Sequence, residues 1–184
     1  MSDMNDFVGT YSGRHFHFLD PQVEDVCIDD IAYQLSRTNR WGGACRPSMN
    51  VADHSVRVSQ MLLRGGHSLL VQMQGLLHDA AEAYLGDVPS PIKAHLPNYH
   101  ALELLAESVI FEALGVKYPL DPMVKVADVE AYRWEYRDLM AGTDVAEPFG
   151  NRPTLEPMSP AAAHLAFLCR YWDLREALDL EVAA

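Results

Sequence analysis

The stretch that decides the fold is Leu76-Leu77-His78-Asp79-Ala80-Ala81-Glu82, which sets a histidine and an aspartate side by side in an apolar run. The spacing of the apolar residues predicts a buried helix here. Polar groups inside a core are costly unless something pairs with them, and a divalent cation would pair with both. Glu82 follows His78 by four residues, so we expect it on the same helix face, near the cation but not bound to it.

Two further candidate ligands lie in other helical segments of the chain. His54 falls in an amphipathic segment over about 50–64, and Asp128 falls in one over about 121–140. Ligands that converge from separate helices are a common way to build a metal site in a bundle core. The expected ligands of one divalent ion are therefore His54, His78, Asp79 and Asp128. Imidazole and carboxylate suit Zn²⁺, Mn²⁺, Fe²⁺ or Co²⁺.

The rest of the chain predicts an all-α fold, a single compact helical bundle with a small N-terminal β-hairpin. Alternation around Ser12-Gly13 predicts the hairpin within a β element at 1–28. Apolar periodicity and helix-breaking residues predict six helices. The first begins near residue 29, and the others cover about 50–64, 68–84, 98–114, 121–140 and 159–178. Asp29 or Asp30 should cap the first of these helices, and Asp121 the fifth. We expect one domain over 1–184, with a long surface loop at 141–158.

Composition excludes several classes of function. The chain has 184 residues and a formal net charge of -12, which repels a nucleic-acid backbone. Its apolar runs are too short to span a membrane, and no signal peptide is evident. The three cysteines are scattered and form no CxxC pair. This usage is typical of the reducing cytoplasm, where we expect the protein to work.

The four candidate ligands follow the pattern H…HD…D, and the chain strongly resembles the HD-domain metal-dependent phosphohydrolases over roughly residues 29–140. The blocks around the pattern resemble the 5'-deoxynucleotidase branch, and related phage dATP triphosphohydrolases share most of them. These blocks are Asn39-Arg40-Trp41, Asn50-Val51-Ala52-Asp53-His54-Ser55, His78-Asp79-Ala80-Ala81-Glu82, Gly86-Asp87-Val88-Pro89-Ser90-Pro91-Ile92-Lys93 and Lys125-Val126-Ala127-Asp128.

The resemblance implies roles for five residues beside the metal ligands. Glu82 would act as general acid or base near the attacking water. Asp87 would position the nucleophile or the sugar. Arg40 and Lys93 would meet phosphate, and Trp41 would pack against the deoxyribose and disfavour a 2'-hydroxyl. Trp41 is also typical of a plain packing residue.

The leading hypothesis is a metal-dependent phosphohydrolase of nucleotides, with a 5'-deoxynucleotidase acting on monophosphates favoured. A deoxynucleoside triphosphate triphosphohydrolase of the dATP type stays open, for which Mg²⁺ would also serve. A di-iron oxygenase would need His95 and His100 as extra ligands, but both are expected at the surface or outside the metal's ligand shell. A nucleotide-binding regulator without catalysis is the last alternative. Partners other than a small nucleotide, such as nucleic acid or membrane, are not expected, and relatives imply a homo-oligomer, a dimer or larger.

Overall fold

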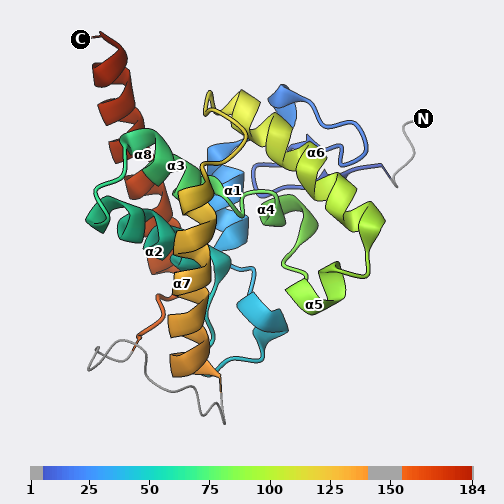
Figure 1. The fold of residues 1–184 in the computed structure, drawn as a ribbon. Helices are drawn as coiled ribbons and strands as arrows, with labels where there is room; N and C mark the ends of the chain where they lie inside the picture. Colours follow the sequence, from blue (N-terminus) through green and yellow to red (C-terminus); the bar gives the residue numbers. More distant parts are fainter. Residues whose placement is uncertain (1–5, 141–154, 184) are drawn as a thin grey trace.

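Residues 6–140 and 155–183 are described by a computed structural model, and helices dominate them (Figure 1). The α-helices are α1 (Ile28–Leu35), α2 (Val51–Arg64), α3 (Leu69–Leu77), α4 (Glu82–Leu85), α5 (Ser90–Lys93), α6 (Pro97–Ala113), α7 (Pro122–Leu139) and α8 (Pro160–Ala183). Strands β1 (Val8–Gly9) and β2 (His15–Phe16) pair as an antiparallel hairpin. The predicted helical class with a small N-terminal hairpin is confirmed.

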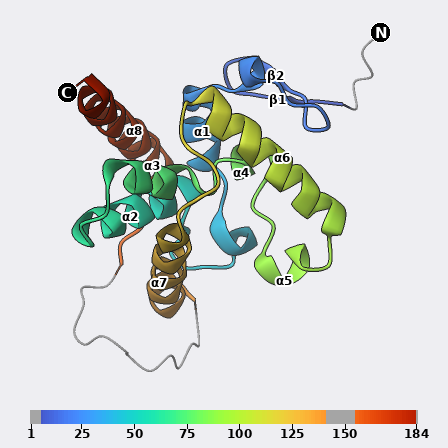
Figure 2. The same ribbon diagram turned by 45° about the horizontal axis from the view of Figure 1, so that its top comes forward.

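The centre of the molecule is the pair α2 and α3, which α7 and α8 flank. Helix α1 packs against α4 and α8, while α6 and the β1–β2 hairpin lie on the side of the molecule opposite α8 (Figure 2). The main core draws large side chains from most of these elements, including Phe16, Ile31, Leu76, Phe111 and Phe167. None of the helices in the described part of the chain combines the length and the apolar character needed to cross a membrane.

Two local features explain how α2 and α7 begin and how α2 meets α3. The side chain of Asn50 accepts a hydrogen bond from the Asp53 N–H, and that of Asp121 accepts one from the Met123 N–H. Both residues are therefore N-caps, as predicted for Asp121. Helices α2 and α3 approach so closely that a Cβ added at Gly75 would clash with Leu62 Cδ1.

The predicted continuous helix over 68–84 is wrong, because the chain breaks at the His-Asp pair. Helix α3 ends at Leu77, a turn covers 78–81, and α4 begins at Glu82. In the turn, the backbone bonds run from Ala80 N–H to the Leu77 carbonyl and from Glu82 N–H to the Asp79 carbonyl, three residues apart. The chain is wound more tightly here than an α-helix, so Glu82 shares no continuous helix with His78.

Several predicted boundaries also need correction. Helix α1 begins after Cys27 without a side-chain cap, and Asp29 and Asp30 lie in its first turn. Asp30 instead accepts hydrogen bonds from the N–H and hydroxyl of Ser12, which tie the hairpin loop to α1. The β element predicted at 1–28 holds two-residue strands and a 3₁₀ turn over Val23–Asp25.

The later boundaries differ as well. The Gly86–Pro91 segment does end α4, but the short helix α5 begins within it at Ser90. Helix α8 continues to Ala183, past the predicted end near 178. Of the loop predicted at 141–158, residues 141–154 lie outside the described residues, and 155–158 are in neither helix nor strand.

Candidate metal centre

The structure brings the four predicted ligands together from α2, the turn after α3, and α7. His54 Nε2 lies 3.1 Å from Asp128 Oδ1 and 3.7 Å from Asp79 Oδ2. His78 Nε2 lies 3.2 Å from Asp79 Oδ2 and 3.8 Å from Asp128 Oδ1. Ligand atoms of His54, His78 and Asp128 all lie within 4.8 Å of one another, and Asp79 flanks this group. Four residues from three separate segments of the chain thus present nitrogen and oxygen donors to one point.

Hydrogen bonds on the far sides of the two imidazoles orient them toward this point. His78 Nδ1 lies 2.9 Å from the Gly75 carbonyl oxygen, to which it donates. His54 Nδ1 lies 2.7 Å from Glu135 Oε1. Both Nε2 atoms therefore face the aspartates, and the buried His78 Nε2 makes no hydrogen bond. A buried nitrogen without a hydrogen-bond partner, facing carboxylates, fits a divalent cation of the imidazole- and carboxylate-binding kind.

Electrostatics in the cluster favour a cation. Burial opposes charge on His78, but Asp79 and Asp128 outweigh it and raise the pKa of His78 well above its ordinary value. Burial likewise opposes charge on Asp128, yet the neighbouring His54 and His78 imidazoles hold the pKa of Asp128 far below its ordinary range. The carboxylates thus favour positive charge at this point, which a bound metal ion would supply.

Glu135, which was not among the predicted site residues, is fully buried and contacts His54. It lies on α7, seven residues after Asp128, so both residues share one helix face. Burial would raise the pKa of Glu135, but His54 and Arg40 lower it, so the side chain is a carboxylate. The two-turn spacing from Asp128 was the signal that could have found it.

Arg40 and Trp41 lie in a tight turn beside the cluster, the 3₁₀ element η2 over Arg40–Gly43. The Arg40 side chain is buried, with Nη1 3.9 Å from Asp79 Oδ2 and Nε 3.1 Å from Glu135 Oε2. Trp41 has φ 52°, in the left-handed region that non-glycine residues rarely adopt. The centre of its ring lies 4.8 Å from the Arg40 guanidinium carbon and 6.1 Å from the centre of the Tyr132 ring. Arg40 thus reaches the cluster from this turn, and the half-buried Trp41 lies against it.

Glu82 is buried near the cluster, in an environment that favours its protonated form. Burial raises the pKa of Glu82 most, and Asp79 and Asp87 raise it further, so that it lies well above its ordinary value. Lys93 and Arg40 act in the opposite direction. Lys93 Nζ lies 3.5 Å from Glu82 Oε1. The arrangement can therefore supply a proton from Glu82.

Asp87 and Lys93, two further predicted site residues, lie close to Glu82. Burial raises the pKa of Asp87, while Arg40 and the Trp41 backbone act to lower it. Lys93 Nζ lies 2.6 Å from Glu103 Oε1, a buried partner on α6 that the sequence did not reveal. The lysine predicted to meet phosphate is thus already paired with an anion.

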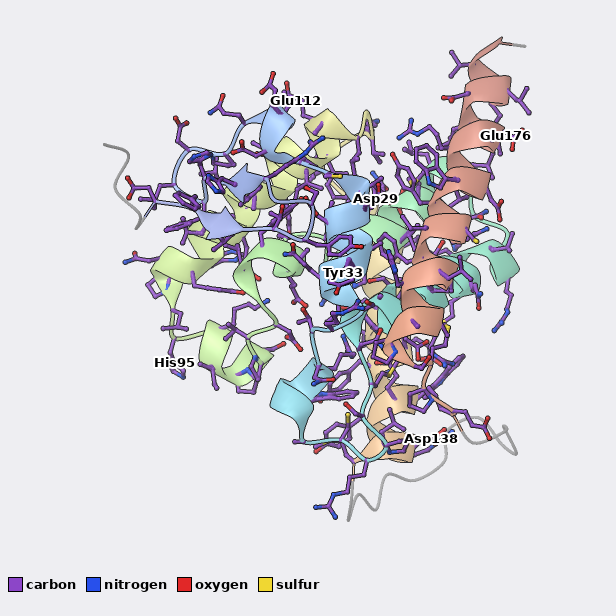
Figure 3. The ribbon with its side chains drawn as sticks, turned by 180° about the vertical axis from the view of Figure 1, so that it is seen from behind. Asp29, Tyr33, His95, Glu112, Asp138 and Glu176 are labelled. Atoms are coloured by element: carbon purple, nitrogen blue, oxygen red, sulfur yellow. The ribbon has the colours of Figure 1, made fainter. Side chains whose placement is uncertain are left out.

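His95 and His100 are both exposed, and neither belongs to the metal-binding group found among residues 6–140 and 155–183. Figure 3 shows His95 at the edge of the molecule beside α5. His100 Nδ1 lies 3.8 Å from Glu103 Oε2. The structure therefore gives no support to a second metal ion bound by these histidines.

Comparison with known proteins defines the class. The model of the HD domain family matches residues 32–139, and the chain belongs to this family. HD domains are generally metal-dependent phosphohydrolases, which supports a hydrolase whose His54, His78 and Asp128 could bind the metal. The chain is 33% identical over 180 residues to the uncharacterized protein YfdR of Escherichia coli, covering 92% of this chain and 96% of that protein. It is 32% identical over 145 residues to an uncharacterized protein of Rhodobacter capsulatus, covering 74% of each.

Proposed function

We propose that the protein is a metal-dependent 5'-deoxynucleotidase, which converts a deoxynucleoside monophosphate and water to a deoxynucleoside and phosphate. The observation that carries this proposal is the buried guanidinium of Arg40 beside the cluster, with Nη1 3.9 Å from Asp79 Oδ2. A phosphate oxygen held at the cluster would meet this arginine. The sequence blocks that resemble the deoxynucleotidase branch add support.

The residues that would hold a divalent ion are His54, His78, Asp79 and Asp128. Such an ion, when bound, acidifies water and polarises a phosphoryl oxygen. Arg40 would contact two phosphate oxygens through parallel hydrogen bonds, a geometry that suits guanidinium and phosphate. Its position is supported from behind by Glu135.

Glu82 would act as the general acid. When the bond between phosphorus and O5' breaks, the nucleoside oxygen leaves with the bonding electron pair and needs a proton. A carboxyl group whose pKa is raised by burial and by Asp79 holds its proton to higher pH than an ordinary glutamate and can supply it to the leaving oxygen. Asp87, half-buried beside Glu82, would accept a hydrogen bond from the sugar or from the attacking water.

Trp41 would set the preference for deoxyribose. Its indole lies at the rim of the cluster and is constrained by a left-handed backbone and by contact with Arg40. A bulky ring near C2' excludes an additional hydroxyl by contact, which penalises the ribonucleotide without strengthening the deoxynucleotide.

A second candidate is the deoxynucleoside triphosphate triphosphohydrolase, and Lys125 favours it. Its Nζ lies 2.7 Å from Asp128 Oδ2, while 78% of the side chain is exposed. An exposed cation beside a metal ligand is well placed to meet additional phosphates. Attack at the α-phosphorus breaks the same bond to O5', so Glu82 would serve both reactions.

The test is a screen of deoxy- and ribonucleotides as mono-, di- and triphosphates with Mn²⁺, with products resolved by chromatography. We expect phosphate and a deoxynucleoside from deoxynucleoside monophosphates. Asp128→Asn should abolish the reaction, whereas Glu130→Gln, two residues along the same helix, should not. Release of triphosphate alone would favour the second candidate, and no hydrolysis of any nucleotide would refute both.

A further inference from the structure

We propose that Glu135 is a positioning residue that joins the two halves of the site, the metal ligand His54 and the phosphate-binding Arg40. This inference rests on the proposed function, because it assumes a metal ion at the cluster and a phosphate at Arg40. Nothing in the resemblance to known enzymes assigns a role to this residue.

The geometry gives each oxygen of Glu135 its own partner. Oε1 lies 2.7 Å from His54 Nδ1, and Oε2 lies 3.1 Å from Arg40 Nε. The Glu135 side chain is 1% exposed and that of His54 is 0% exposed, so water cannot replace either partner. One buried carboxylate therefore bridges α2 and the turn that carries Arg40.

The bond to His54 selects the tautomer that a metal ion needs. A carboxylate accepts hydrogen bonds, so the proton of the neutral ring stays on Nδ1 and the Nε2 lone pair faces Asp128. Ligating histidines generally need such a partner on their other nitrogen, and its loss typically weakens metal binding about 10–100-fold. Without Glu135, the proton could move to Nε2 and block the ligand position.

The ion pair between Glu135 and Arg40 competes with the ion pair between Arg40 and Asp79. Arg40 Nη1 is already 3.9 Å from Asp79 Oδ2, and Asp79 and Asp87 both attract the guanidinium. Glu135 holds Nε from the opposite side and leaves the outer nitrogens for a phosphate. If Glu135 lost its charge, Arg40 would move toward Asp79 and neutralise a metal ligand.

Helix α7 thus supplies both Asp128 and Glu135, the residue that orients His54. A substitution that tests Glu135 must leave the packing of this helix intact. A cavity of about 70 Å³, lined in part by Arg57, Met61 and Leu155, lies beside Glu135. Truncation to alanine would enlarge this cavity and risk unfolding. Glu135→Gln keeps the volume but loses the charge, and it offers one oxygen where Glu135 offers two, so its NH₂ group must face either Nδ1 of His54 or Nε of Arg40.

The experiment compares wild type, Glu135→Gln and the matched surface variant Glu130→Gln from the same helix. Binding of Mn²⁺ alone is measured by titration calorimetry, the His54 tautomer by ¹⁵N NMR, and KM for a deoxynucleoside monophosphate at saturating Mn²⁺. We expect Glu135→Gln to weaken Mn²⁺ binding about 10–100-fold. We also expect its KM to be higher than that of the wild type even when Mn²⁺ saturates the metal site. Glu130→Gln should change neither.

The outcomes separate this inference from the proposed function. The role of Glu135 alone is overturned if the wild type binds Mn²⁺ and hydrolyses nucleotide but Glu135→Gln leaves the Mn²⁺ affinity, the His54 tautomer and KM unchanged. Recovery of a normal KM at saturating Mn²⁺ overturns the link to Arg40. Wild type without Mn²⁺ binding overturns both proposals. If Glu135→Gln does not fold, Glu135→Asp takes its place, because it keeps the charge but is one methylene too short to reach both partners.

Discussion

Replacing Lys93 by methionine should move the pH dependence of catalysis to higher pH. If Glu82 donates a proton to the leaving oxygen, kcat falls as pH rises through the pKa of Glu82. Burial together with Asp79 raises that pKa, and Lys93 is among the groups that lower it. Lys93→Met removes a positive charge that lowers the pKa of Glu82. Glu82 therefore stays protonated to higher pH, and the falling limb of kcat moves to higher pH.

The distances set the size of this shift. Lys93 Nζ lies 3.5 Å from Glu82 Oε1, and two unit charges at this separation interact by about 5 kcal/mol at an effective dielectric constant of about 20. Glu103, at 2.6 Å from the same Nζ, and solvent at the partly exposed lysine reduce that interaction. We expect a remaining effect of about 1.4–3 kcal/mol, which corresponds to about 1–2 pH units.

The assay measures kcat at saturating substrate and Mn²⁺ across the pH range for wild type and two variants. Glu103→Gln is the matched control, because it removes the anion that offsets Lys93 and should move the limb to lower pH. Shifts in opposite directions support the role of Glu82. A falling limb at the same pH in all three proteins would refute the assignment of Glu82 as the acid.

Three other predictions follow from single positions. Glu82→Gln should bind Mn²⁺ as wild type does but lower kcat about 10²–10⁴-fold, and loss of the metal in calorimetry would instead make Glu82 a ligand. Trp41→Ala should raise kcat/KM for ribonucleotides relative to deoxynucleotides, whereas an unchanged ratio would make the indole a packing residue. Gly75→Ala should lower the free energy of unfolding by about 1–3 kcal/mol in urea titration, because its Cβ meets Leu62, and wild-type stability would contradict the close packing of α2 on α3.

The sequence was sufficient for the parts of the fold that depend on local patterns. Apolar periodicity located α2, and together with the predicted cap at Asp121 it located α7, within a residue or two. The same reasoning failed at residues 78–81, because periodicity continues through a tight turn as readily as through a helix. The imidazole of His78 bonds to the Gly75 carbonyl at the end of α3, and no pattern of apolar residues encodes that bond.

The sequence likewise predicted some residues of the site but not others. His78 and Asp79 stand out because they interrupt an apolar run, His54 and Asp128 complete the H…HD…D pattern, and the structure brings all four together. Glu135 and Glu103 did not stand out, because each becomes significant only when another segment of the chain packs against it. The pairing of Glu135 with Arg40 joins residues on α7 and in the turn before α2, and only the tertiary structure shows it.

Metal content measured together with phosphate release tests the central claim most directly. Protein stripped with a chelator, protein reloaded with Mn²⁺ and folded Asp128→Asn are compared by elemental analysis and by hydrolysis of a deoxynucleoside monophosphate. We expect one ion per chain in the reloaded protein, activity that is lost on stripping and regained on reloading, and neither ion nor activity in Asp128→Asn. Phosphate release that continues unchanged in the stripped protein, with no ion bound, would contradict a metal-dependent hydrolase at this site.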